Sequence, residues 1–377
     1  MLPGAGPADR PGAPADAHES PGALHVHSTF SWDGHGEVDA IASAARSSGL
    51  DWIGMTDHDT LGARYAGFEG VREGVHVVVG YEWSPSGGDH ALMYGERETL
   101  PDTIANTVPP AEAIRIVTEA GGMAFVAHPD EGRSALRSLP PLPWRDWTIL
   151  GFTGIELWNY MSEWAEHLTR WNAVHHALRP GVRMGGPTAR TLAWWDRLNR
   201  PSPGDGFAGG PRLTVGLSGV DAHGEGVRIG GRYVTVFPYG RVFRTFTNVL
   251  LLADRLPAEP TAARAAILAA MRDGHVLFAD RTRGDPFGTT FDAWVPSGRL
   301  GIGGRGALPA SGRAELRVRL PIEAEIHLLR DGERVAEGRG RELVARATSA
   351  GAYRVEARRS GRAWLFTNPI VLSASQV

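Results

Sequence analysis

Cysteine and lysine are both absent from the 377 residues, so all 39 side chains counted as lysine or arginine are arginine. Without cysteine, the chain has no thiol nucleophile, no disulfide framework and no cysteine-ligated zinc or iron–sulfur site. Without lysine, it has neither a Schiff-base lysine nor a P-loop lysine for a phosphate. The side chains left for demanding chemistry are 42 carboxylates, 14 histidines, hydroxyl groups and arginine.

Long apolar runs and a strong net charge are missing as well. No apolar run approaches the roughly 18 residues of a membrane span. The formal net charge is −3 and the arginines are spread along the chain, which disfavours a nucleic-acid partner. Residues 1–22 are rich in proline, glycine and alanine and lack the features of a secretory signal. We therefore expect a disordered leader over residues 1–22, a cytoplasmic location and no membrane contact.

Between residues 23 and 285, short apolar runs alternate with helical patterns. Strands are predicted at 24–27, 51–56, 75–82, 122–127, 155–158, 214–218 and 275–279, and helices at 38–47, 110–120, 163–177, 188–198 and 261–272. The segment 200–210, rich in proline and glycine, reads as a surface loop. This alternation is typical of βα units and predicts an α/β domain over residues 23–285.

The pattern changes after residue 284. Short runs that alternate between apolar and polar residues occur at 315–320, 325–330, 334–337, 342–347, 353–358 and 364–367. Asp331-Gly332 is a strong hairpin-turn signal between two of them. We expect a small antiparallel β-sandwich over residues 286–377, joined to the first domain through the glycine-rich stretch 298–312.

Histidines and carboxylates recur where the predicted strands of the first domain end. The candidate metal ligands are His25, His27, Asp33, His58, Glu82, His90, His128, Asp221 and His223. Taken singly, each of these residues could have an ordinary structural role instead of binding metal; His58 or Asp221, for example, could cap a helix. Their recurrence at six strand ends, where barrel enzymes collect catalytic residues, predicts a metal site. Nine donors exceed the needs of one ion, so we expect two or three divalent ions, either Mn, Zn or Fe.

The ordered motifs resemble those of the PHP (polymerase and histidinol phosphatase) superfamily over about residues 23–285. They are Leu24-His25-Val26-His27-Ser28, Asp33-Gly34, Thr56-Asp57-His58-Asp59, Gly80-Tyr81-Glu82, His128-Pro129 and Val220-Asp221-Ala222-His223. The resemblance implies a distorted seven-stranded β/α barrel with metals at the C-terminal strand ends. Segments 154–159, 161–164, 194–198 and 354–369 also resemble a branch with an appended C-terminal β-domain, which includes a carbamate-ester hydrolase. Many members place the loop aspartate one residue closer to the first motif, whereas Trp32 intervenes here.

The resemblance also implies how the nine ligands are shared. His25, His27, Glu82 and Asp221 would hold one ion, and Glu82 would bridge to a second ion held by His90 and His128. Asp33, His58 and His223 would hold a third. A hydroxide bridging two ions would be the nucleophile. Asp221 would orient it, and His223 or His58 would protonate the leaving group.

Four residues are candidate substrate contacts. Arg64 and Arg133 follow His58 and His128 on loops at the same end of the barrel, where a guanidinium could clamp a phosphate. Glu156 and Asn159 end another strand and are expected to line the pocket.

Four functions compete on this pattern. The favoured one is a metal-dependent phosphoesterase that acts on a small phosphomonoester or phosphodiester. The second is a metallohydrolase of carboxyl or carbamate esters, and the third is a nuclease. The fourth is a binding or scaffold protein in which the metals are structural. In the first two cases the partner is a small-molecule substrate.

Overall fold

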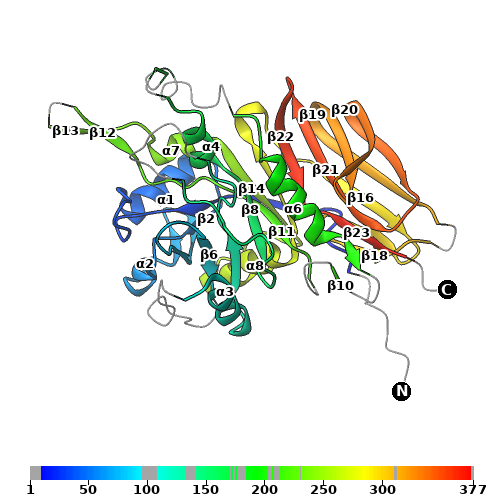
Figure 1. Cartoon of the computed structure of the whole chain (residues 1–377), viewed down its shortest axis with the longest axis horizontal. Coiled ribbons are helices and arrows are strands. Elements are labelled where there is room, and N and C mark those ends of the chain that lie inside the picture. The colour runs from blue at the N-terminus through cyan, green and yellow to red at the C-terminus, as the bar shows by residue number, and fades with distance from the viewer. Residues whose placement is uncertain are drawn as a thin grey trace.

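The computed structural model describes residues 10–95, 108–132, 141–169, 171–172, 175, 184–202, 206–207, 212–229, 231–309 and 312–374. It is a mixed α/β structure dominated by sheet, with few helices. Figure 1 shows most of the blue-to-green elements on one side and the orange-to-red strands on the other, with β14 (Phe246–Leu252) and the red strand β22 (Arg362–Thr367) where the two sides meet. None of the described helices is long and apolar enough to cross a membrane.

The first part of the large sheet is built around β1. Its parallel strands are β1 (His18–Val26), β2 (Trp52–Met55) and β4 (Val75–Val79), with β3 (Gly70–Arg72) antiparallel at the edge. On the other side of β1 lies β14 (Phe246–Leu252), which runs antiparallel to it and to β15 (Val276–Asp280). Every residue of β2 and β14 is buried, as expected for strands covered on both faces.

A second sheet of five strands completes the site-bearing part. Its order is β11 (Val215–Gly219), β8 (Gly154–Asn159), β7 (Met123–Val126), β6 (Ala91–Tyr94) and β5 (Tyr81–Trp83). Two isolated bridges connect the sheets, Val26 to Ala222 and His58 to Glu82. Only Gly80 separates β4 from β5. The ends of β1, β2, β5, β7, β8 and β11 therefore converge on one region.

Helices cover the outside of these strands. They are α1 (Val38–Ser47), α2 (Gly62–Tyr65), α3 (Pro110–Glu119), α4 (Tyr160–Glu166), α6 (Ala189–Asn199), α7 (Tyr239–Val242) and α8 (Pro260–Asp273), with a 3₁₀ turn at Arg281–Arg283. Helix α1 has the predicted bounds because its apolar stripe is helical in spacing, with Val38, Ile41, Ala42 and Ala45 buried. Helix α4 instead begins before the expected residue 163 and ends at Glu166.

The C-terminal strands continue the large sheet. They are β16 (Thr290–Val295), β17 (Gly298–Leu300), β18 (Arg305–Ala307), β19 (Ala314–Arg330), β20 (Glu333–Ala347), β21 (Gly351–Arg359), β22 (Arg362–Thr367) and β23 (Ile370–Ser373). All pair antiparallel except β18 with β23. Strand β22 pairs with β15, so 14 strands form one connected sheet across both parts of the chain.

Several expectations for chain organisation are wrong. The leader does not extend through residue 22, because β1 begins at His18 and pairs with β14, and Ala13 is buried. The stretch 298–312 is not a plain linker, since it contains β17 and β18. Four of the short C-terminal runs merge into the two long strands β19 and β20. The predicted loop at 200–210 contains two short paired strands, β9 (Pro201–Ser202) and β10 (Gly206–Phe207). A hairpin of β12 (Gly226–Ile229) and β13 (Arg232–Thr235) was not predicted.

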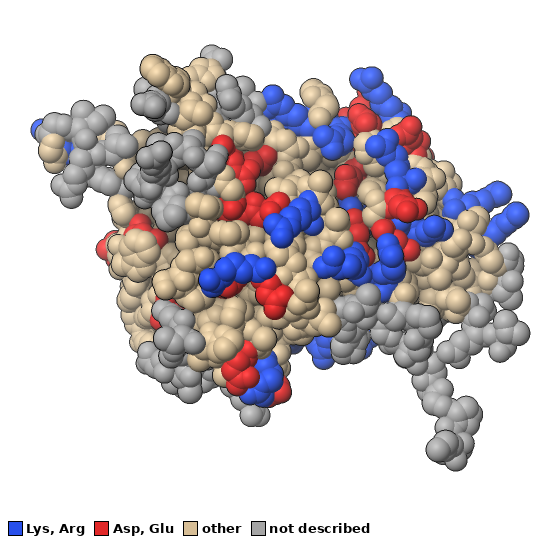
Figure 2. All heavy atoms as spheres, in the orientation of Figure 1, with Lys and Arg blue, Asp and Glu red and all other residues tan. Residues whose placement is uncertain are grey.

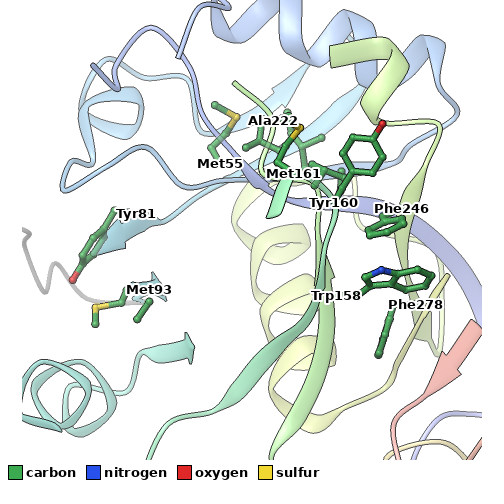
Figure 3. Close-up of a cluster of buried hydrophobic side chains, with 14 of the residues drawn as sticks. Met55, Tyr81, Met93, Trp158, Tyr160, Met161, Ala222, Phe246 and Phe278 are labelled. Atoms are coloured by element: carbon green, nitrogen blue, oxygen red, sulfur yellow. The ribbon is translucent and has the colours of Figure 1, made fainter. Parts of the chain in front are cut away.

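An aromatic core lies beneath the convergent strand ends. Figure 3 shows Trp158 between Phe246 and Phe278. The ring centroids of Trp158 and Phe246 are 4.3 Å apart, and Phe278 stacks on Phe366 at 5.2 Å. These rings come from β8, β14, β15 and β22. The core therefore packs the strand that carries Glu156 and Asn159 against the sheet that continues into the C-terminal part.

Candidate metal centre

The end of β1 delivers two imidazoles to the same side. The register with β2 shifts between Leu24 and Val26, and His25 has a left-handed backbone with φ of 67°. Beyond this irregularity, backbone hydrogen bonds join His25 and His27 to Ala222. Both imidazoles are fully buried and their ring centroids are 5.1 Å apart. The local bulge therefore turns the strand end inward, a common role of such irregularities next to active sites.

Glu82 is the centre of the cluster and is 1% exposed. Five imidazoles contact its carboxylate. Oε2 lies 3.1 Å from His25 Nε2, 3.4 Å from His27 Nε2 and 3.2 Å from His58 Nδ1, and Oε1 lies 2.8 Å from His90 Nδ1 and 3.3 Å from His128 Nε2. Imidazole nitrogens surround each of the two oxygens of Glu82. Each oxygen could therefore bind a different cation together with the imidazoles next to it, so the carboxylate is suited to bridge two ions.

Asp221 faces Glu82 across His25, near the end of β1, and His27, the residue after it. Its Oδ1 lies 3.3 Å from His25 Nε2 and 3.5 Å from His27 Nε2. Its backbone is left-handed, with φ of 52°, directly after β11. Asn159 donates to its other oxygen at 3.4 Å. Asp221 and Glu82 thus flank the same pair of imidazole nitrogens.

A third group lies at the rim. Asp33 Oδ2 is 3.0 Å from His58 Nε2 and 3.3 Å from His223 Nε2. The rings of His223 and His27 stack with centroids 4.0 Å apart, which connects this group to the buried one. Trp32, 85% exposed, stacks over His58 at 5.5 Å.

The charges of the cluster shift its pKa values strongly. Burial alone would raise the pKa values of Glu82 and Asp221, but the surrounding histidines, His25 first, hold both well below their ordinary values. Burial alone would lower the pKa of His25, but Asp221, Glu156 and Glu82 raise it well above its ordinary value. Burial and the neighbouring His223 lower the pKa of His27 to about 3. His27 is therefore a neutral imidazole at neutral pH.

The donor set fits divalent cations. Four overlapping groups have ligand atoms within 4.8 Å of one another. They are His27, Asp33, His58 and His223; His25, His128 and Asp221; His25, His27 and Glu82; and Glu82, His90 and His128. Among the described residues, the buried atoms His27 Nε2 and Asp33 Oδ1 have no hydrogen-bond partner. Neutral imidazole and carboxylate oxygen suit Zn, Mn and Fe(II), and a cation would satisfy these two atoms.

The structure thus brings all nine sequence-predicted ligands into one cluster of overlapping groups, although His27 also groups with Asp33, His58 and His223, and Asp221 with His25 and His128. Glu156 and Asn159 adjoin it, with Glu156 bonded to His25. Arg64 is directed elsewhere, because its Nε lies 3.0 Å from Glu69 Oε2 on the segment between α2 and β3. Arg133 lies outside the described residues.

Four further side chains support the cluster and were not singled out from the sequence. Ser84 Oγ lies 2.6 Å from His58 Nδ1, and Glu225 Oε1 lies 3.3 Å from His223 Nδ1. Glu131 Oε2 lies 3.4 Å from His128 Nδ1, and Asp57 accepts hydrogen bonds from the backbone and hydroxyl of Ser28. A carboxylate three residues after His128, and another inside the Thr56–Asp59 motif, were the available signals.

A cavity of about 40 Å³ opens beside His128, between β8, α4 and the start of α6. Its described lining includes the carboxylates of Asp130, Glu131, Glu156, Glu163 and Glu166 and contains no arginine. In Figure 2, acidic side chains gather near the middle of the visible face, whereas arginines are frequent over the C-terminal strands. The side of the cluster next to this cavity is therefore acidic.

Comparison with known proteins agrees with the motifs and the donor geometry. The family match covers residues 23–120, which include the donors from His25 to His90. The matching family is the PHP domain family. This PHP domain and the clustered donors support a metal-dependent hydrolase.

Individual relatives are distant. An uncharacterized protein of Methanocaldococcus jannaschii is 28% identical over 117 residues, which are 28% of this chain and 66% of that protein. The match thus spans just under two thirds of the relative's length.

Solved structures are similar at low identity. A two-domain protein from Bacteroides vulgatus, described as containing a predicted PHP-like metal-dependent phosphoesterase, is 11% identical with a TM-score of 0.41, covering 97% of this chain and 99% of that one. Endonuclease Q in complex with a 27-mer duplex is 15% identical with a TM-score of 0.37, covering 78% and 60%. These similarities are too distant to assign an activity.

Proposed function

We propose that the protein is a metal-dependent hydrolase that cleaves a small phosphomonoester or phosphodiester at the nine-residue cluster. The observation that carries this proposal is the set of five imidazoles around the buried carboxylate of Glu82. Overlapping donor groups support adjacent ions, and adjacent ions suit the several oxygens of a phosphoryl group. When bound, such ions act as Lewis acids and lower the pKa of water.

The residues of the chain would divide the work as follows. His25, His27, Glu82 and Asp221 would hold one ion, Glu82, His90 and His128 a second, and Asp33, His58 and His223 a third. Asp221 would also position the attacking water through its carboxylate. The rim histidines His58 and His223 are the candidates to deliver a proton to the leaving group, because both are less buried than His25 and His27.

Hydrolysis of carboxyl or carbamate esters is the second candidate. The described lining of the cavity beside His128 has five carboxylates and no arginine, and Arg64 is paired with Glu69. Such a lining favours a substrate whose group in this cavity carries no negative charge. Phosphate binding would then depend on the ions themselves.

A substrate panel with and without chelator tests the proposal. The full chain, supplied with Mn²⁺ or Zn²⁺, is assayed on aryl phosphomonoesters, phosphodiesters, carboxyl esters and carbamates. We expect turnover of one phosphoester class that chelator abolishes. Chelator-sensitive turnover of only carboxyl esters or carbamates would replace the first candidate by the second. No turnover, with less than one ion per chain, would contradict a hydrolase.

We also propose a division of labour along the chain. Residues 23–285 would form the catalytic part, shaped as a PHP-like barrel that closes at the two isolated bridges, and residues 286–377 an appended β-domain. The paired strands around the cluster, and a second hydrophobic cluster made mostly of C-terminal residues with some from β14 and β15, support this division. Cleavage of oligonucleotides in the same panel would instead indicate the nuclease, and bound metal without turnover the scaffold.

A further inference from the structure

Glu156 is a buried carboxylate whose hydrogen bonds all point toward the metal cluster. It lies on β8 and is 1% exposed. Its Oε1 lies 2.8 Å from His25 Nδ1. Its Oε2 accepts hydrogen bonds from the backbone N–H of His128 at 2.8 Å and from Asn159 Nδ2 at 3.0 Å. Both oxygens are therefore used within the protein, which leaves Glu156 poorly placed to bind a substrate.

The contact with His25 determines how that imidazole is used. When the His25 ring is neutral, as a metal ligand must be, a carboxylate facing Nδ1 favours the tautomer in which Nδ1 carries the proton and donates a hydrogen bond to Glu156. The lone pair is then on Nε2, which faces Glu82 Oε2 at 3.1 Å and Asp221 Oδ1 at 3.3 Å. Nε2 is the atom that His25 contributes to the candidate metal groups on this side.

The backbone around Glu156 leaves room for this contact. Gly219, at the end of β11, has no side chain, and a Cβ at this position would overlap Glu156 Oε1 and lie 3.0 Å from His25 Cβ. Asn159 adds a second fixed point, because its side chain accepts from Ser162 N–H at the start of α4 while it donates to Glu156. Three elements, β8, β11 and α4, thus hold the carboxylate in place.

We infer that Glu156 is a positioning residue of the metal centre: it holds His25 with Nε2 directed at one ion and holds the backbone of His128 beside a second. The inference rests on the proposed function and replaces the expected role of Glu156 as a substrate contact. Carboxylates that accept the second ring proton of a metal-bound histidine typically change metal affinity by about 10- to 100-fold when they are removed.

Glu156→Gln tests this role. A glutamine amide has only one accepting oxygen, so its NH₂ group must face either His25 Nδ1–H or the donors of His128 and Asn159. The matched control is Glu163→Gln. Glu163 also lines the cavity and accepts from three donors, namely Trp158 Nε1 and the backbone N–H groups of Gly185 and Gly186, and none of these three donors belongs to a candidate ligand.

The measurements are Zn²⁺ and Mn²⁺ affinity by chelator competition, bound metal per chain by elemental analysis, and the ¹⁵N shifts of the His25 ring. We expect Glu156→Gln to weaken binding by about 10- to 100-fold and to change the His25 tautomer signal. Glu163→Gln should retain wild-type affinity even if its melting temperature falls. Equal affinity in Glu156→Gln and wild type, or an equal loss in Glu163→Gln, overturns the inference.

A second pair of variants tests the inference if Glu156→Gln does not fold. If Glu156→Gln is not recovered folded, Glu156→Asp keeps the charge but is one methylene shorter, so it cannot reach His25 and His128 together. We expect weaker metal binding than in Glu163→Asp, and wild-type affinity overturns the inference. Wild-type protein that binds no divalent ion overturns this inference and the proposed function together. Metal-dependent turnover with unaltered metal affinity in the variants overturns this inference alone.

Discussion

At the scale of single residues, the cluster is a concentration of buried charge. Glu82 and Asp221 are ionised at neutral pH although both are almost fully buried. Burying a charge is costly unless it is paired, and here the partners are imidazoles that also repel one another. Divalent cations relieve both problems, since they neutralise the carboxylates and use the imidazole lone pairs. Removing one ligand should therefore affect metal binding before it affects the fold.

Asp221→Asn should remove an ion and most of the activity. The amide keeps the shape of the side chain but lacks the negative charge that faces His25 and His27. We expect bound metal to fall by at least one ion per chain and kcat/KM to fall at least about 100-fold. Asp285→Asn is the control, because the Asp285 side chain is 65% exposed and forms an ion pair with Arg281, which is not a candidate ligand. Unchanged metal content in Asp221→Asn would contradict the ligand assignment.

Metal affinity should rise with pH across the neutral range. Burial alone would lower the pKa values of the cluster histidines, but neighbouring carboxylates raise those of His25, His58 and His223, and raise that of His128 to about 9. Without metal, the raised pKa values favour the protonated form of these rings, and a cation must displace those protons. His27, with a pKa of about 3, contributes none.

Competition titrations at pH 6, 7 and 8 measure this effect. The apparent affinity should increase by about tenfold per pH unit for each proton displaced. Calorimetry in two buffers of different ionisation enthalpy counts the released protons independently. An affinity that does not change over this range would show that the rings are already neutral.

The site was more predictable from the sequence than its surroundings. Most of its candidate ligands lie at or just past the end of a strand, and a strand end is visible as the last residue of an apolar run; His90, which comes just before β6, and Asp33, in the loop after β1, are exceptions. The direction of Arg64 was not predictable, because its partner Glu69 lies on the next segment and only the folded chain brings them together. The same holds for Glu156, whose contact with His25 joins residues 131 positions apart.

At the scale of elements, the bounds of α1, α3, α6 and α8 followed from periodicity to within one residue, but those of α4 and of the long strands did not. Pro321 and its neighbours interrupt the alternating pattern, so two strands were expected where β19 is continuous. The structure accommodates the proline where the register with β20 shifts, between Arg319 and Ala324. Proline lacks a backbone donor and is tolerated at such irregularities. Gly338 and Gly340 likewise interrupt the alternating pattern within β20, so two short strands were expected where β20 is continuous.

Gly22 on strand β1 lies against a buried tryptophan that leaves no room for a side chain at this position. A Cβ at Gly22 would overlap the indole of Trp52, which is fully buried. We expect Gly22→Ala to lower the free energy of unfolding by about 1–3 kcal/mol, because the ring has no room to move. Urea denaturation followed by tryptophan fluorescence measures it. Gly185→Ala is the control, since no atom lies within 4 Å of its added Cβ. Equal stability of the two variants would show that β1 adjusts freely.

At the scale of the whole molecule, buried polar groups tie the C-terminal strands to the rest. Asn368, fully buried after β22, accepts from Gly216 N–H on β11 and donates to the carbonyls of Gly216 and Val276. Arg354 on β21 donates to both oxygens of Asp196 on α6, at 2.5 and 2.7 Å, and to Glu356 at 2.6 Å. Together with the continuous sheet, these contacts predict one cooperative unfolding transition.

Arg354→Ala should destabilise the whole protein. It leaves the buried carboxylates of Asp196 and Glu356 without their cation, which typically costs about 3–5 kcal/mol. We expect the single denaturation transition to move to lower urea concentration as a whole. Arg334→Ala, which removes a pair with Glu337 on the surface, should move it little. Two separate transitions in either variant would show that the two parts unfold independently.

The pairing of β22 with β15 has a consequence for synthesis on the ribosome. Strand β15 is translated long before β22, so one of its edges has no partner while the intervening strands are made. An open edge of buried, apolar residues is a template for pairing with another nascent chain. The interval between the two strands is therefore the period in which the growing polypeptide is most exposed to aggregation, and in which a chaperone would help most.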